Sequence, residues 1–140
     1  NEAMNSIAGY SCYNDGSIRD WQRHTSQFTA GKNFVGTGGF GPWMISSDEI
    51  PDPSVLRIET RLNGKVMQSA PISDLVFNVP KLIAYISSFT ELEAGDVIIT
   101  GTTGGVGAAR TPPVWMKAGD TVEVEISKIG TLINPILDAN

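Results

Sequence analysis

The sequence predicts an α+β domain that is mainly β. Two β-prone arms, within residues 55–71, flank Asn63-Gly64, which is the strongest short signal for a two-residue hairpin turn. Residues 119–127 alternate between apolar and polar side chains, as a strand with one buried face does. Only residues 78–89 indicate a substantial helix. We therefore expect strands to form most of the core.

The first part of the chain predicts a strand, a short helix and a loop, in that order. Residues 7–13 are apolar and β-prone. Residues 17–24 predict a short helix, with Ser17 as the N-cap and Asp20 three residues later, a short-acid version of the capping box. Residues 31–41 contain five glycines and therefore predict a loop. Further strands are predicted at 42–46, at 95–101, at 119–127, at 129–137 and in the two arms of the hairpin.

The helix predicted at 78–89 has a proline in its first turn. Pro80 fits its first turn, where a backbone N–H would have no partner within the helix. We expect the face that contacts the core to carry Leu82, Ile83, Ile86 and Phe89. No repeat or linker divides the chain, so its length of 140 residues predicts a single domain over 1–140.

Composition narrows the function classes. The net charge of −5, without a cluster of Lys and Arg, argues against nucleic acid as a partner. No apolar run approaches the roughly 20 residues that span a bilayer, so we expect no membrane association. The single cysteine, Cys12, excludes an internal disulfide and favours a reducing, cytoplasmic location. Its apolar neighbours predict a buried thiol; the alternative is a catalytic one.

One glycine motif has the spacing of a dinucleotide-binding fingerprint but the wrong surroundings. Gly36, Gly38 and Gly41 match the pattern G-x-G-x-x-G. In a dinucleotide fold these glycines follow a strand and open a helix. Here Pro42 and a predicted strand follow instead, so we reject nucleotide binding at this motif.

A second glycine-rich stretch, TGTTGGVG at 100–107, follows an apolar segment. It lacks the Gly-Lys-Ser/Thr sequence of a phosphate-binding P-loop. Backbone N–H groups and the hydroxyls of Thr100, Thr102 and Thr103 nevertheless suit a carboxylate ligand. A tight cluster of turns without a ligand is the alternative interpretation.

The stretch YNDGSIRDWQ, residues 13–22, is unusually polar for a strand-to-helix corner. Arg19 and Gln22, three residues apart, share one face of the predicted helix, and Asp15 precedes it. This motif is one of those that could carry chemistry. The alternative is a solvated helix in which Arg19 forms an ion pair with Asp15 or Asp20.

Several motifs occur in order over nearly the whole chain: GYSCYNDGSIRDWQ, GKNF, GPWMISSDEIPDP, LNGKVMQ, LIAYIS, TELEAGDVIITGTTGGVG and AGDTVEVEISKIGTLINP. Together they resemble the fumarylacetoacetate hydrolase family. The resemblance implies a mainly β fold with a mixed, rolled sheet arrangement, commonly dimeric. It also implies Mg²⁺, Mn²⁺ or Ca²⁺ bound through acidic residues, and action on 2-oxo or 1,3-dicarbonyl acids.

The resemblance assigns roles to five residues of this sequence. Asp15 falls on a metal-binding Asp of the family, and Arg19 and Gln22 fall on residues that face the substrate. Lys32 falls on the Lys of the pattern Gly-Lys-x-Phe, and Thr102 on the Thr that follows Thr-Gly. We therefore expect Lys32, Arg19 and Gln22 to be catalytic, all three and Thr102 to bind substrate, and Asp15 to bind the metal.

The chain also departs from the family pattern. Thr103 replaces a frequent proline and Gly16 a frequent apolar residue. Two further metal carboxylates of the family lie in a Glu-x-Glu element upstream of the first strand, and this sequence has none there; Glu2 stands at the wrong distance. We therefore expect the chain to be the C-terminal part of a catalytic domain. Its fold would then be incomplete at the N-terminal side, and an upstream segment or a partner chain would supply the missing Glu ligands.

The resemblance favours one reaction and leaves others open. We expect hydrolytic cleavage of a C–C bond in an acylpyruvate-like substrate, with Mg²⁺ or Mn²⁺ as cofactor, Ca²⁺ as an alternative, and a homodimer as the assembly. Lyase, hydratase, isomerase or decarboxylase activity of the same family is the alternative. A non-catalytic fragment or binding module is the rival from another class, since one carboxylate alone binds divalent ions weakly.

Overall fold

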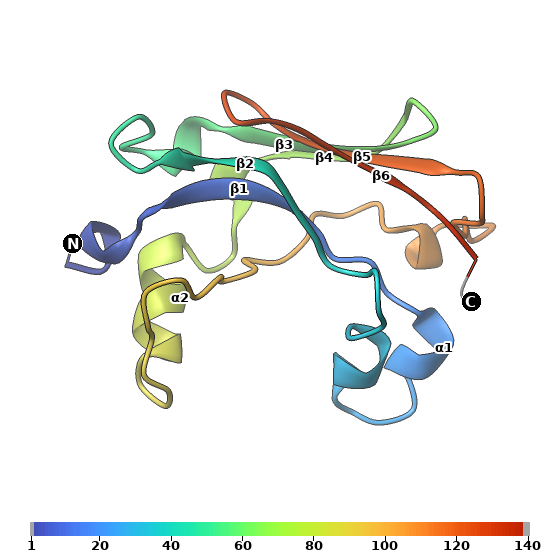
Figure 1. The fold of residues 1–140 in the computed structure, drawn as a ribbon, viewed down its shortest axis with the longest axis horizontal. Coiled ribbons are helices and arrows are strands. Elements are labelled where there is room, and N and C mark those ends of the chain that lie inside the picture. Colours follow the sequence, from blue (N-terminus) through green and yellow to red (C-terminus); the bar gives the residue numbers. More distant parts are fainter. Residues whose placement is uncertain (1, 139–140) are drawn as a thin grey trace.

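Two antiparallel β-sheets form the framework of the chain (Figure 1). The structure is a computed structural model that describes residues 2–138. β1 (Gly9–Asn14) pairs with β2 (Gly39–Ser46), and a four-stranded sheet has the order β4-β3-β5-β6. Its strands are β3 (Arg57–Leu62), β4 (Lys65–Pro71), β5 (Thr121–Ile126) and β6 (Gly130–Pro135). All four pairings are antiparallel, which confirms a mainly β chain.

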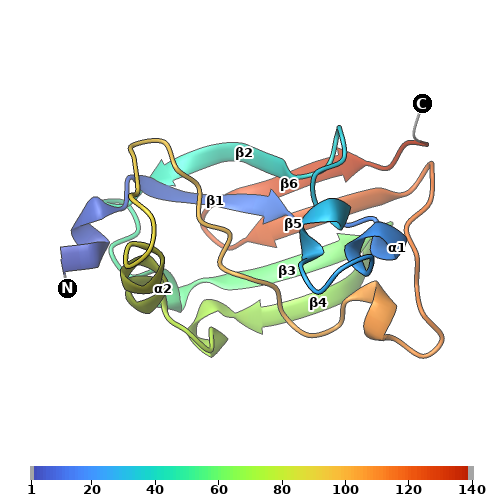
Figure 2. The same cartoon turned by 90° about the horizontal axis from the view of Figure 1, so that it is seen from below.

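Short helices lie on one side of this framework. Figures 1 and 2 show α1, α2 and the segment that follows α2 on the same side of the sheets, with α1 and α2 toward opposite ends. None of the helices in residues 2–138 has the length and apolarity needed to cross a membrane. The helices are α1 (Arg19–Gln22) and α2 (Val79–Ile86), and the 3₁₀ turns are η1 (Glu2–Ser6), η2 (Phe28–Gly31), η3 (Pro53–Val55), η4 (Ile72–Asp74) and η5 (Gly107–Ala109).

The predicted hairpin is confirmed, and its turn is anchored to β5. Asn63 and Gly64 have φ values of 50° and 78°, as the two central residues of a type I′ turn require. The Asn63 amide donates to the Asp120 carboxylate (2.9 Å) and accepts from the Thr121 N–H (2.8 Å). Asp120 also accepts from the N–H of Lys117 (2.9 Å). The hydrogen bond from Asn63, followed by that from Lys117, lowers the pKa of Asp120.

The core lies between the two sheets. On β5, Val122, Val124 and Ile126 are buried and alternate with half-buried polar residues, as predicted. Cys12 is fully buried, which confirms its predicted environment, and burial raises the pKa of its thiol. The buried apolar residues are Cys12, Ile50, Leu56, Val122, Val124, Ile126, Ile129 and Leu132.

The opposite face of the four-stranded sheet is polar. Arg61 on β3 donates to Glu59 (2.9 Å), to Glu123 (2.6 Å) and to Glu125 (2.7 Å). These hydrogen bonds, with that to Glu123 first, raise the pKa of Arg61 above its ordinary value. Cross-strand pairs of this kind stabilise a sheet face that water reaches.

The predicted helix 17–24 is shorter and starts differently. α1 covers only four residues, and its N-cap is Ile18, which makes no side-chain cap hydrogen bond. Ser17 is therefore not the N-cap; its hydroxyl donates to a carbonyl two residues earlier (3.2 Å). The N–H of Ile18 donates to the carbonyl of Gly31 (2.9 Å), so contact with η2 fixes the entry to the helix.

The strand predicted at 95–101 is not formed. This stretch has no regular secondary structure, and it pairs with no strand within residues 2–138. Val97 and Ile99 are about half exposed, at 54% and 46%. An apolar, β-prone sequence becomes a strand only where a neighbouring strand accepts its hydrogen bonds, which explains the difference.

Two other predicted bounds were wrong. Gly39–Gly41 belong to β2 instead of the loop 31–41, because β1 supplies a ladder partner for each of them. A Cβ on Gly39 would lie 2.7 Å from the side chain of Asn134, so glycine also allows β2 to approach β6. α2 ends at Ile86, leaving Phe89 outside the helix and 68% exposed. The single domain over 1–140 stays a prediction.

Candidate active site

An ion pair joins the two motifs on which the predicted site depends. Asp15 follows the last residue of β1, and Lys32 follows the last residue of η2. The Lys32 ammonium donates to the Asp15 carboxylate across 17 residues of sequence. Their side chains are 29% and 39% exposed, respectively, so both remain accessible to a ligand. The structure thus brings together two of the five predicted residues.

Close packing of α1 against η2 holds this pair in place. Gly31 is buried, and a Cβ there would lie 2.6 Å from the Cβ of Gln22, so only glycine fits. The rings of Trp21 and Phe34 meet edge to face, 5.4 Å apart. We call residues 15–34 the α1–η2 unit.

Gln22 is the most buried polar residue of this unit. It is only 5% exposed, and its side-chain oxygen has no hydrogen-bond partner within residues 2–138. A buried acceptor without a donor costs about 1–3 kcal/mol. The position therefore suits a donor that arrives from outside the described residues, which is consistent with the predicted substrate-binding role.

Arg19 makes no ion pair within residues 2–138. The alternative interpretation of this stretch, an ion pair of Arg19 with Asp15 or Asp20, is therefore not observed. Lys32 takes the place next to Asp15 instead. Arg19 is half-buried, on the first turn of α1.

Thr102 belongs to a different group of contacts. The side-chain amide of Gln68, on β4, donates to the Thr102 hydroxyl (2.8 Å) and to the Thr103 carbonyl (2.9 Å). The structure gives no hydrogen bond between Thr102 and the α1–η2 unit among residues 2–138. In Figure 2 the segment that leads to η5 crosses the same side of the sheets as α1.

Two residues of this second group were missed by the sequence reasoning. Gln68 lies in the motif LNGKVMQ, and Arg110 in a segment that matched no motif. Arg110 donates to the carbonyls of Gly105 (2.9 Å) and Met67. No local signal in the sequence marks Gln68, because its pairing with Thr60 and the loop that it contacts are determined by the fold.

The described residues do not form a metal site by themselves. No group of three or more His, Cys, Asp or Glu side chains within residues 2–138 is arranged to hold a metal ion. One oxygen of Asp15 is already bonded to Lys32. Hard divalent cations take several oxygen ligands, so Asp15 is at most one of them.

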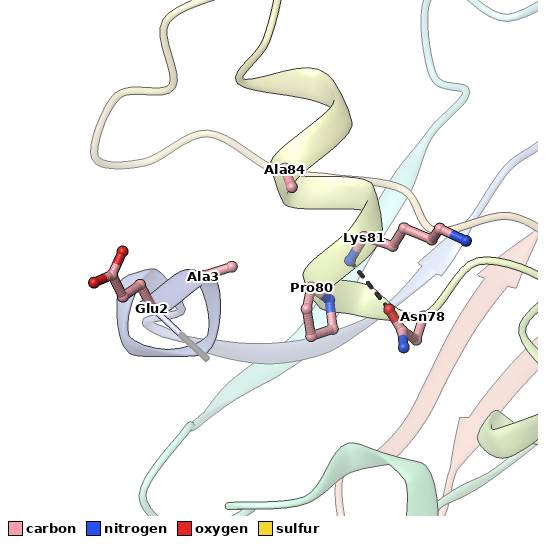
Figure 3. A pocket seen from close by; sticks show the side chains of 6 residues that line it. All are labelled: Glu2, Ala3, Asn78, Pro80, Lys81 and Ala84. Atoms are coloured by element: carbon pink, nitrogen blue, oxygen red, sulfur yellow. Dashed lines mark hydrogen bonds between the residues drawn. The ribbon is translucent and has the colours of Figure 1, made fainter.

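Glu2 takes no part in this site. It lies in η1, beside α2, at the end of the molecule opposite α1 (Figures 1 and 2). Figure 3 shows its carboxylate pointing away from Lys81 across a hollow that is open to solvent. Glu2, Ala3, Asn78, Pro80, Lys81 and Ala84 line this hollow. It has no cluster of chemically active side chains.

Comparison with known proteins assigns the chain to a family. Residues 1–137 match the family model described as fumarylacetoacetate (FAA) hydrolase C-terminal. The mitochondrial oxaloacetate tautomerase FAHD2A of Bos taurus is 42% identical over 97% of this chain and 44% of its own length. The oxaloacetate tautomerase YisK of Bacillus subtilis is 42% identical over 96% of this chain and 45% of its own.

Solved structures of similar proteins agree with this family assignment. A fumarylacetoacetate hydrolase from Exiguobacterium antarcticum is 38% identical, with a TM-score of 0.94, over 99% of this chain and 50% of its own. The maleylpyruvate hydrolase of Sphingobium sp. SYK-6, solved with manganese(II) and pyruvate, is 28% identical, with a TM-score of 0.84, over 99% of this chain and 47% of its own.

The chain belongs to the fumarylacetoacetate hydrolase family and has the fold of that family. The resemblance found in the sequence is thus confirmed. Relatives in this family are named tautomerases, isomerases and hydrolases, so they are enzymes and include proteins that act on 2-oxo acids. The chain spans about half the length of the curated relatives it matches.

Proposed function

We propose that this chain is part of an enzyme that enolises 2-oxo acids and that it interconverts the enol and keto forms of oxaloacetate. The Asp15–Lys32 ion pair carries the proposal, because it joins two of the motifs to which the family resemblance assigns site residues. The relatives from cattle and Bacillus subtilis support oxaloacetate as the substrate, since both are named oxaloacetate tautomerases.

Lys32 stabilises the charge that develops in this reaction. In enolisation a base takes a proton from carbon and a proton is later placed on the oxygen of the 2-oxo group, so negative charge builds up on that oxygen in between. The base would come from outside the residues assigned here. The Lys32 ammonium has three N–H donors, so it can keep its hydrogen bond to Asp15 and direct another to that oxygen. Asp15 orients the ammonium. Such a preorganised donor is typically worth about 10²–10³ in kcat.

Arg19 and Gln22 orient the substrate. The Arg19 guanidinium, without an ion pair within residues 2–138, suits a substrate carboxylate through two parallel hydrogen bonds. The unpaired oxygen of Gln22 suits a donor such as the hydroxyl of an enol. In this proposal the Thr102 hydroxyl donates a hydrogen bond to a substrate carboxylate.

Hydrolytic cleavage of a C–C bond in an acylpyruvate-like substrate is the second candidate. The likeness to the maleylpyruvate hydrolase favours it. Cleavage next to a 2-oxo group also passes through an enolate, so Lys32 and Arg19 would have the same roles in both reactions. A water-activating group would be needed in addition.

The proposal includes a divalent cation, Mg²⁺ or Mn²⁺, with Ca²⁺ as the alternative. The manganese in the maleylpyruvate hydrolase structure supports metal use in this family. Asp15 would be one ligand, and Glu side chains outside the described residues, from an upstream segment or a partner chain, would be the others. A homodimer of the complete protein and a cytoplasmic location, which the single free Cys12 favours, are also part of the proposal; the bovine relative is named as mitochondrial.

The reaction is tested on the complete protein with oxaloacetate. We expect the ultraviolet absorbance of the enol to decay faster with enzyme and Mg²⁺ than with enzyme and a chelator. A parallel assay with acylpyruvates measures cleavage. Acceleration of cleavage alone would replace the first candidate by the second, and acceleration of neither reaction would refute both.

The isolated 140-residue chain tests the need for further segments. Large apolar side chains are exposed on several elements, including Trp43 (57%), Val76 (87%) and Tyr85 (70%). We therefore expect the chain alone to self-associate and to lack divalent-dependent turnover. Adding the proposed upstream segment, in cis or in trans, should restore a monodisperse active species. A monomer by light scattering that also shows divalent-dependent turnover would contradict this.

A further inference from the structure

Residues 100–110 are held on β4, which is an edge strand of the four-stranded sheet. The contacts come from side chains that the proposed reaction has not used. Gln68 on β4 bonds to Thr102 and Thr103, and Arg110 bonds back to Met67 on β4. We call residues 100–105 the Thr102 loop. A loop fixed at two separate points is positioned more accurately than a free one, which matters if it binds substrate.

The Gln68 amide uses both of its N–H groups on this loop. Its nitrogen lies 2.8 Å from the Thr102 hydroxyl and 2.9 Å from the Thr103 carbonyl. A primary amide has two hydrogens on nitrogen, so these two short bonds use its donors, and a longer contact with the Thr103 hydroxyl (3.3 Å) shares one of them. Gln68 pairs with Thr60 on β3, and directly paired residues project from the same face of a sheet. The register of the hairpin therefore aims Gln68 at the loop.

This contact decides what the Thr102 hydroxyl can do. The amide nitrogen only donates, so the Thr102 oxygen must accept from it. The hydrogen of the hydroxyl is then left to donate elsewhere. Thr102 is exposed, so an external acceptor can reach it. A carboxylate is the strongest acceptor that a 2-oxo acid offers, and a hydrogen bond to a charged acceptor is stronger than one to a neutral group.

We propose that Gln68 is a positioning residue: it holds the Thr102 loop on β4 and makes the Thr102 hydroxyl a donor to the substrate carboxylate. The identity of the acceptor rests on the proposed function, whereas the attachment of the loop to β4 does not. Gln68 itself does not touch the substrate in this scheme.

A second attachment keeps the rest of the segment in place when Gln68 is changed. Arg110 donates to the carbonyl of Gly105 (2.9 Å) and to that of Met67. Gly105 has φ +100°, and a Cβ there would lie 2.3 Å from the carbonyl oxygen of Met67. Removing the Gln68 amide should therefore loosen residues 100–104 locally and leave the fold intact.

NMR relaxation tests the attachment without any substrate. In the complete protein, Gln68→Met should lower the backbone order parameters of residues 100–104 and leave those of β3 and β5 unchanged. Met is close to Gln in size and has no donor. Thr90→Met is the control, because Thr90 is exposed and lies outside both the Thr102 loop and the α1–η2 unit. Unchanged order parameters of residues 100–104 in the Gln68 variant would overturn the attachment.

Steady-state kinetics test the effect on Thr102. We expect Gln68→Met and Thr102→Val each to raise KM about tenfold, as the loss of a hydrogen bond to a charged group does, with kcat changed less than about twofold. The double variant should be no worse than either single variant, because Gln68 acts through Thr102. Additive effects, or a fall in kcat alone, would overturn the positioning role.

A change of polarity gives a sharper test. In Gln68→Glu the carboxylate accepts from the Thr102 hydroxyl, so the hydrogen turns away from the substrate and a negative charge is added. KM should rise more than in Gln68→Met, and Thr90→Glu controls for the added charge at an exposed position outside the α1–η2 unit. If the wild-type protein turns over neither oxaloacetate nor acylpyruvates, the proposed function fails while NMR relaxation still decides the attachment. Lower order parameters with an unchanged KM would refute the donor role of Thr102.

Discussion

The four-stranded sheet and the α1–η2 unit differ in how completely they satisfy their own side chains. The sheet buries alternate residues of β5 and balances Arg61 against carboxylates on its other face. The α1–η2 unit has a helix of only four residues, leaves Trp21 and Phe28 about half exposed, and buries the unpaired oxygen of Gln22. The four-stranded sheet thus contributes most of the stability, whereas the α1–η2 unit carries the polar groups that are free to bind a ligand.

This difference separates the two kinds of variant that can be made. A substitution in the sheet removes packing or a hydrogen bond that the chain itself supplies, so it should change the free energy of unfolding. A substitution at Asp15, Arg19 or Lys32 removes a group with few internal contacts, so it should change activity and leave stability nearly unchanged. Variants of either region that behave in the opposite way would break the comparison.

The largest effect is expected for Asp15→Ala in the complete protein. The change removes the partner that orients Lys32 and the proposed metal ligand, so divalent-dependent turnover should be abolished. Turnover is measured at saturating Mg²⁺ and Mn²⁺, beside Asp74→Ala, which alters an exposed carboxylate elsewhere. Activity of Asp15→Ala close to that of the wild type would refute the assignment.

Leu56→Ala should have the largest effect on stability. Leu56 is 2% exposed and lies in the core between the sheets, and truncation of such a residue costs about 2–5 kcal/mol. Val55→Ala is the matched control. Val55 precedes Leu56 and is 62% exposed, so its truncation should change the free energy of unfolding by less than about 0.5 kcal/mol. Denaturant unfolding measures both. Equal effects of the two variants would mean that the core is not where the structure puts it.

Lys32→Met should reduce kcat by about two orders of magnitude or more, the usual loss for a donor that stabilises transition-state charge. Its unfolding midpoint should stay near that of the wild type, because the ion pair with Asp15 is partly exposed. Lys81→Met, on α2, controls for loss of a positive charge. An unfolded variant, or one with normal kcat, would exclude the catalytic role.

Asp120→Asn sharpens the comparison through pH. The pKa of Asp120 is lowered in the folded chain by the hydrogen bonds from Asn63 and Lys117. Its stabilising contribution is therefore complete above the unfolded pKa of about 3.9 and is lost as pH falls through the lowered folded pKa. The variant should be less stable than the wild type at pH 7, and the difference should shrink on acidification. A difference that grows below about pH 4 would contradict this sign.

Local signals predicted the sheet well. Asn63-Gly64 determines its hairpin through backbone angles that the two residues themselves prefer, and the alternation at 119–127 reports a single buried face. The stretch at 95–101 has the same kind of β-prone composition but no strand beside it. The alternation of apolar and polar residues indicates which face a strand buries. Whether the strand forms at all depends on a neighbouring strand that is distant in sequence.

The candidate site was only partly predictable. The resemblance indicated Asp15 and Lys32, and the structure shows that the two form an ion pair. Their pairing was not predicted, because the alternative interpretation considered only Arg19 as a partner, with Asp15 or Asp20. Gln68 was missed because its contact with Thr102 depends on the register of β4 and on the path of a loop more than 30 residues away. Neither is readable from local sequence.

Cys12 provides a built-in reporter of opening. It is the only cysteine of the sequence, its side chain is fully buried, and its thiol hydrogen-bonds to the Gly130 carbonyl on β6 (3.4 Å). A thiol reagent can therefore modify the chain only when β1 separates from its neighbours, and every modified molecule records one such event. When closing is faster than labelling, the labelling rate divided by that of a free thiol gives the free energy of that separation, so the effect of an added segment on the core can be followed by mass.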